Sequence, residues 1–149
     1  MELTDYTGKL NDHESYLDIL NRIDKKCEYI EVVILDEKES NDLIEKFRND
    51  IISVKKVKEW WGTKVDSLEP CNYLYQLKYS KRLYNNLSKF ETFCKYFEYS
   101  TTKKSLEYGD YREITDFGMD DIAFYDHNGN YLLWTTTHEG YILVNDKII

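Results

Sequence analysis

The sequence predicts a single α+β domain over residues 1–149, in which about three helices pack on an antiparallel or mixed sheet that ends in a three-stranded β-meander. Three observations predict this class. Apolar residues recur at helical spacing, a β-branched run follows the first helical segment, and an Asn-Gly pair separates two strand-like runs near the C-terminus. The length fits one domain, and no linker, repeat or low-complexity tract divides it.

Three segments have the pattern of an amphipathic helix. The first begins at Asn11, with Glu14 as its capping-box partner, and continues to about Lys26. A second, short helix begins at Ser40. The third begins at Ser80 and is expected to extend through residue 97, because its apolar side chains follow 4-3-4-3 spacing. These side chains are Leu83, Leu87, Phe90, Cys94 and Phe97.

Three further segments in the first half of the chain predict strands. Residues 28–36 are rich in β-branched side chains and contain a continuous apolar run, which is typical of an interior strand. Residues 51–65 favour a strand that ends in a bulge or turn near Gly62. Residues 71–79 alternate between apolar or aromatic and polar side chains, so we expect a half-buried strand there.

The C-terminal segment predicts the meander. Asn128 and Gly129 separate residues 121–126 from residues 131–137. Because both residues of an Asn-Gly pair tolerate positive φ, the pair predicts a hairpin with a type I′ turn. Residues 138–140 predict a second turn, and residues 141–149 a third strand.

Composition excludes several classes of protein. The longest apolar run is far shorter than the ~18 residues needed to span a bilayer, and the acidic N-terminus lacks the pattern of a secretory signal. The three cysteines, Cys27, Cys71 and Cys94, are odd in number and form no C-x-x-C motif. We therefore expect reduced thiols, a cytoplasmic protein and no membrane partner.

The net charge of −8 is unevenly distributed. Residues 1–54 carry 14 acidic and 7 basic side chains, residues 55–104 carry 5 and 11, and residues 105–149 carry 9 and 2. Two acidic ends repel phosphate, which disfavours a nucleic-acid partner. Binding of nucleic acid could begin only in the basic segment, at Lys55, Lys56, Lys58 and Lys64.

An acidic ribbon over residues 107–121 is the most distinctive charge feature. It holds six carboxylates in fifteen residues, countered only by Arg112. Such crowding is costly unless a cation relieves it, so the ribbon predicts a docking surface for a basic protein; a solvated loop is the alternative. The expected partner-binding residues are Glu107, Tyr108, Asp110, Tyr111, Glu113, Asp116, Asp120, Asp121, Trp60 and Trp61.

The adjacent Trp60 and Trp61 belong to this set because alternation along a strand would bury one indole and expose the other. An exposed Trp is a frequent interface hot spot. A Trp half-covered by its neighbours is the alternative.

Signals for catalysis are weak, and we expect no catalytic residue and no cofactor. Residues 126–130 resemble the start of a calcium loop, but Tyr131 replaces the glycine that the sixth position requires. His138 and Glu139 lack the second histidine of a zinc helix, so polar turn residues are the alternative. A metal-dependent hydrolase built from Asp120, Asp121, His138 and Glu139 is the second functional hypothesis.

In size, negative charge and lack of catalytic motifs, the chain resembles small toxin-neutralising proteins, such as immunity proteins and some antitoxins. This resemblance implies a bacterial, cytoplasmic, non-enzymatic protein whose partner is a basic toxin. It rests on general character, so it assigns no role to an individual residue.

Overall fold

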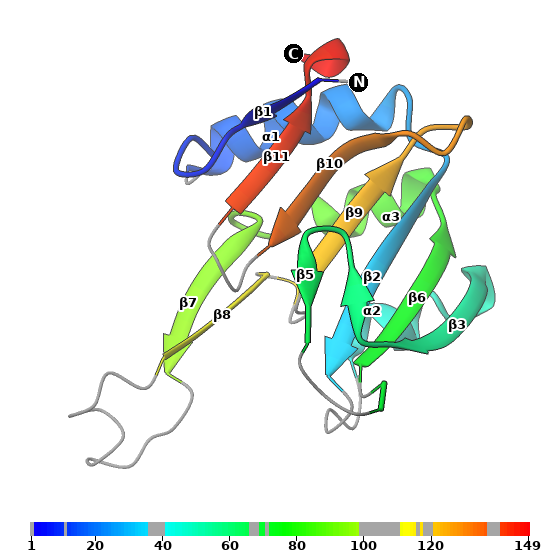
Figure 1. Ribbon diagram of the computed structural model, residues 1–149. Helices are drawn as coiled ribbons and strands as arrows, with labels where there is room; N and C mark the ends of the chain where they lie inside the picture. The colour runs from blue at the N-terminus through cyan, green and yellow to red at the C-terminus, as the bar shows by residue number, and fades with distance from the viewer. Residues whose placement is uncertain are drawn as a thin grey trace.

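A computed structural model describes residues 2–10, 12–35, 41–65, 69–70, 72–98, 111–115, 117, 121–136 and 141–149. Three α-helices accompany a seven-stranded antiparallel sheet, which is compatible with the predicted α+β class (Figure 1). The strand order is β1-β11-β10-β9-β2-β6-β3. These strands are β1 (Leu3–Asp5), β11 (Tyr141–Asn145), β10 (Tyr131–Thr136), β9 (Asp121–Tyr125), β2 (Tyr29–Leu35), β6 (Asn72–Lys78) and β3 (Ile51–Val57).

Two small sheets lie outside the main one. Strands β4 (Glu59–Trp60) and β5 (Thr63–Lys64) form a tight hairpin. Strands β7 (Cys94–Glu98) and β8 (Tyr111–Thr115) form an antiparallel pair that projects away from the seven-stranded sheet (Figure 1).

The helices begin at residues with capping side chains. Helix α1 (His13–Asp24) begins after Asp12, whose carboxylate accepts from the Ser15 backbone N–H at 3.0 Å, rather than after the predicted Asn11. Helix α2 (Asp42–Lys46) begins after Asn41, one residue beyond the predicted Ser40. Helix α3 (Lys81–Leu87) begins after Ser80, as predicted. The described residues also form two short 3₁₀ turns, η1 (Arg48–Asp50) and η2 (Asp146–Ile148).

The predicted length of the third helix is wrong. Helix α3 ends at Leu87, and residues 94–98 form strand β7 instead. The fully buried Phe93, between α3 and β7, takes the core position instead, with its ring centre 4.8 Å from that of Tyr16 and 6.0 Å from that of Phe124. Pairing of β7 with β8 therefore outweighs the helical spacing of Cys94 and Phe97.

The sheet is covered on both faces. Helices α1 and α3 pack on one face, and the β4–β5 hairpin lies over the other (Figure 1). The core beneath the helices includes Leu20, Ile30, Leu77 and Phe124, all fully buried. The core beneath the hairpin is formed by Val33, Trp60, Trp61, Leu74, Ala123 and Tyr125. This double cover explains why every residue of β9 is buried.

The predicted hairpin between β9 and β10 is present, but its turn differs from the predicted type. Gly129 has φ of 80°, and no other residue among the described ones except Gly8 and Gly62 has positive φ. A type I′ turn would need two such residues. The Asp126 carboxylate holds the turn instead, accepting from the backbone N–H groups of Asn128 and Asn130, each at 2.9 Å.

Candidate functional site

The structure describes three of the predicted residues of the acidic ribbon, and these lie in two different settings. Glu107, Tyr108, Asp110, Asp116 and Asp120 lie outside the described residues. Tyr111 and Glu113 lie on β8, in the projecting pair of strands (Figure 1). Asp121 belongs to β9 in the middle of the main sheet.

The expectation that Asp121 lies on a docking surface does not fit its environment. Its side chain is 2% exposed and accepts hydrogen bonds from Trp60 Nε1 at 2.7 Å and from Thr135 Oγ1 at 3.3 Å. The cause is topological, because β9 is a central strand whose second face lies under the β4–β5 hairpin. Asp121 is therefore a buried acceptor that holds this hairpin on the sheet.

The expectation that one Trp is exposed is wrong. Trp60 and Trp61 are each 8% exposed, and the N–H of Trp61 donates to the Thr135 carbonyl at 2.9 Å. Strand alternation does not separate the two indoles because β4 ends at Trp60 and the turn begins at Trp61. Gly62 makes the turn at φ of 72°, so close to the sheet that a Cβ there would lie 2.9 Å from the Trp134 ring.

The other sequence-predicted residues are dispersed. His138 and Glu139, proposed as metal ligands together with Asp120 and Asp121, lie outside the described residues. Over the described ranges, no three His, Cys, Asp or Glu side chains are placed to hold a metal ion. The basic residues Lys55, Lys56, Lys58 and Lys64 are exposed along β3 and the hairpin that follows it.

Cys27 is not an activated nucleophile. Burial raises the pKa of its thiol to about 12, and the sulfur donates to the Tyr29 carbonyl at 3.4 Å. The thiol is therefore protonated at neutral pH.

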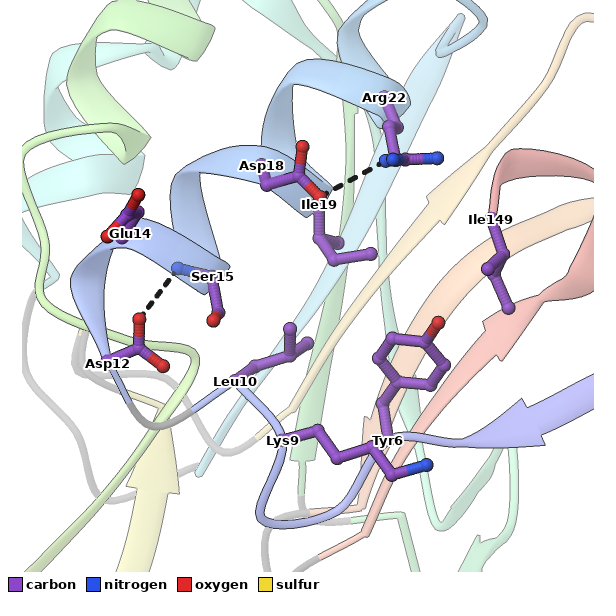
Figure 2. Close-up of a pocket in the computed structure, with 10 residues that line it drawn as sticks. All are labelled: Tyr6, Lys9, Leu10, Asp12, Glu14, Ser15, Asp18, Ile19, Arg22 and Ile149. Carbon is purple, nitrogen blue, oxygen red and sulfur yellow. Dashed lines mark hydrogen bonds and ion pairs between the residues drawn. The ribbon is translucent and has the colours of Figure 1, made fainter.

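A pocket beside α1 gathers charged side chains around an apolar floor (Figure 2). It has a volume of about 380 Å³, within the range of ligand and anchor-residue pockets. Tyr6, Leu10, Ile19 and Ile149 point toward one another across it (Figure 2). The remaining lining residues are Lys9, Asp12, Glu14, Ser15, Asp18 and Arg22. We call this site the α1 pocket.

Carboxylates of the α1 pocket lie along the first two turns of the helix. Asp12 caps α1, and the hydrogen bonds from Ser15 lower the pKa of its carboxyl, which is therefore ionised at neutral pH. Glu14 lies in the first helical turn, where the helix dipole favours negative charge. Asp5 adds a further anion on the neighbouring strand, and hydrogen bonds from Thr7 lower the pKa of its carboxyl.

The two cations of the pocket are already engaged. The Arg22 guanidinium is paired with Asp18 at 3.2 Å and donates to the Ile148 carbonyl at 3.2 Å. The Lys9 ammonium lies 5.2 Å from the centre of the Tyr6 ring. Asp12 and Glu14 are thus the carboxylates of the pocket that carry no ion pair to another described residue.

Sequence reasoning missed this pocket, although its charge signal was visible. Residues 1–54 carry an excess of seven acidic side chains, as large as the excess in residues 105–149. The side chains of the N-terminal segment are spread along the sequence, so no compact motif marks them. Folding brings Tyr6 and Leu10 beside Ile149, a contact between the two ends of the chain that local patterns do not reveal.

No known family model matches this chain, and no curated protein or solved structure shows significant similarity to it. The described helices include none with the length and hydropathy needed to cross a membrane.

Proposed function

We propose that this chain is a small non-enzymatic protein-binding domain that docks on a basic surface of another protein. The α1 pocket, with Asp12 and Glu14 beside an apolar floor, is the observation that carries this proposal. A basic toxin is the partner class that the size and net charge of −8 favour, as in immunity proteins and antitoxins.

The chemistry of the pocket matches a Lys or Arg side chain of the partner. Such a side chain has an apolar stem and a cationic end. The stem would lie on Leu10 and Ile19, which are buried, and on the half-buried Tyr6. The cationic end would reach Asp12 and Glu14 at the mouth. Within the pocket itself, Asp18 already binds the guanidinium of Arg22, as Asp12 and Glu14 would bind the cation of the partner.

The acidic ribbon has a different part in this proposal. Without Asp121 it retains five carboxylates over residues 107–120, opposed by Arg112. Charges of this kind mainly increase the association rate, whereas a filled pocket slows dissociation. Steering by the ribbon predicts an association rate with a basic partner that falls as salt screens the charges.

A capped peptide with one central Arg between glycines tests the pocket directly. We expect the methyl groups of Leu10, Ile19 and Ile149 to shift in NMR spectra as this peptide is added, and a citrulline analogue to cause no shift. The double variant Asp12→Asn, Glu14→Gln should weaken binding by about fivefold or more, because two nearby anions are lost. Asn still caps the helix, so folding is retained.

The matched control is Asp42→Asn, Glu45→Gln, which removes two carboxylates from the first turn of α2, outside the pocket. This variant should bind the Arg peptide like the wild type. Equal weakening by both double variants would show that only net charge matters, and unshifted pocket methyl groups would show that the pocket is not the site.

A further inference from the structure

Strand β3 is an outer strand of the seven-stranded sheet (Figure 1). Its inner side pairs with β6 from Ile51 to Val57, with a register shift between Ile51 and Ser53. In the part of the chain that the structure describes, no strand pairs with its outer side. Backbone N–H and C=O groups on that side are therefore available to a further strand.

The side chains of β3 are also uncovered. All five residues from 52 to 56 are exposed. Ile52 is 57% exposed and Val54 47%, and only Tyr141 and Ile149 match them among the large apolar side chains of the described residues. A seven-residue edge strand with exposed apolar side chains and no described partner strand on its outer side is a template for strand addition.

Positive charge accompanies this edge. Lys55, Lys56 and Lys58 are exposed, and none of them forms an ion pair within the described residues. The Lys56 ammonium lies 5.3 Å from the centre of the ring of Tyr73, the residue opposite Lys56 on β6. Because residues alternate along a strand, Lys55 and Lys56 lie on opposite faces of the sheet. A strand added here would meet a cation on each face.

We propose that β3 binds an extended acidic peptide by strand addition, so that the peptide becomes an eighth strand of the sheet. Its backbone would continue the hydrogen-bonded ladder. An apolar side chain of the peptide would pack on Val54, and its carboxylates would lie beside Lys55 and Lys56. This site is separate from the α1 pocket, whose lining includes Tyr6 and Lys9 just after β1. Strands β1 and β3 are the two outer strands at opposite edges of the sheet (Figure 1).

An acidic peptide fits this edge better than a second copy of the chain or a nucleic acid does. A second copy paired through β3 would bring the lysines of both edges together, and lysines and bulges on edge strands are known to oppose such self-pairing. A nucleic acid has no peptide groups with which to continue the ladder, and its phosphates would lie against the apolar Ile52 and Val54. An acidic peptide satisfies the backbone groups, the apolar side chains and the lysines together.

A fluorescent peptide of Val-Val-Glu-Glu repeats, about nine residues long and so able to span β3, is a suitable probe, because it presents both Val and Glu on each face of the added strand. We expect saturable binding at low ionic strength by fluorescence anisotropy, with slower hydrogen exchange at backbone amides of β3. The double variant Lys55→Glu, Lys56→Glu changes two exposed side chains, so it should fold normally and bind the peptide at least about tenfold more weakly. Asp12→Asn, Glu14→Gln should bind it undiminished.

A second peptide of the same charge, with all of its backbone amides N-methylated so that neither edge can donate, separates strand addition from simple ionic attraction. Because it cannot continue the ladder, it should not bind detectably. Equal binding of both peptides would overturn the proposal, as would no binding of the first. The proposal would also fail if the free chain formed a dimer that protects the β3 amides. Tighter binding of a single-stranded oligonucleotide at those amides would assign the edge to nucleic acid instead.

Discussion

The face of the sheet beneath α1 and α3 is covered mainly by aliphatic and phenyl side chains, whereas the opposite face is covered by two indoles whose N–H groups are hydrogen-bonded. Leu20 and Leu77 are typical of the first face. On the second, Trp60 donates to Asp121 and Trp61 to the Thr135 carbonyl. The difference shows that a six-residue hairpin can bury one face of a sheet in place of a helix, provided that its buried N–H groups are hydrogen-bonded to the sheet.

The largest difference between the faces should appear in conservative substitutions. We expect Trp60→Phe to lower the free energy of unfolding by about 3 kcal/mol, because it removes ring volume and one of the hydrogen bonds to the buried Asp121 carboxylate. Leu20→Met, which conserves volume in the aliphatic core, should cost less than about 1.5 kcal/mol. Urea unfolding of both variants measures the two values. Equal losses would mean that the polar contact does not distinguish the faces.

A smaller difference should separate two glycines that both have positive φ. Gly62→Ala places a Cβ 2.9 Å from the Trp134 ring and 3.1 Å from Thr136 Cγ2, whereas a Cβ at Gly8 meets nothing within 4 Å. Both variants incur the backbone cost of about 1 kcal/mol. Gly62→Ala should lose roughly 1–2 kcal/mol more, since the hairpin must move away from the sheet. Thermal unfolding compares them, and equal losses would show that the close approach costs nothing.

The smallest effect concerns one tyrosine on each face. Burial, and then a hydrogen bond to Glu31, raises the pKa of Tyr125 on the second face. Burial and a hydrogen bond to Asp24 likewise raise the pKa of Tyr79 on the first. In the unfolded chain both tyrosines ionise near pH 10, so their stabilising contribution is complete below about pH 10 and declines above it.

Tyr125→Phe and Tyr79→Phe should each cost about 1 kcal/mol at neutral pH and reduce the alkaline decline in stability. Urea midpoints between about pH 7 and about pH 11 measure both effects. A decline as steep in the double variant as in the wild type would contradict the assignment.

Local patterns predicted the parts of the fold that depend on neighbouring residues. The strand at 28–36 and the hairpin around Gly129 were found because a β-branched run and an Asn-Gly pair are local signals. The first two helix starts were displaced by one residue, since Asn11 precedes Asp12 and Ser40 precedes Asn41, and each of these residues is an eligible cap.

The remaining errors share a physical cause, which is pairing between distant segments. The spacing of Cys94 and Phe97 suits a helix until β8 is available to pair with β7. In the sequence Asp121 resembles its acidic neighbours. It becomes a buried acceptor because the hairpin that carries Trp60 packs over it. The α1 pocket likewise depends on Ile149 reaching the first helix. Each of these partners is far from the other in sequence, beyond the short run of neighbouring residues in which helical or strand periodicity can be recognised.

Strand β1 lies beside β11, so that Leu3 is opposite Asn145 and the backbone carbonyl of Glu2 accepts from the backbone N–H of Asp146. The two strands at this edge of the sheet, β1 and β11, therefore come from opposite ends of the described sequence. The central strands β2 and β9 are also widely separated in sequence. Strands so distant in sequence can pair only after long loops have closed, which costs chain entropy. We therefore expect the chain to fold in milliseconds to seconds rather than in microseconds.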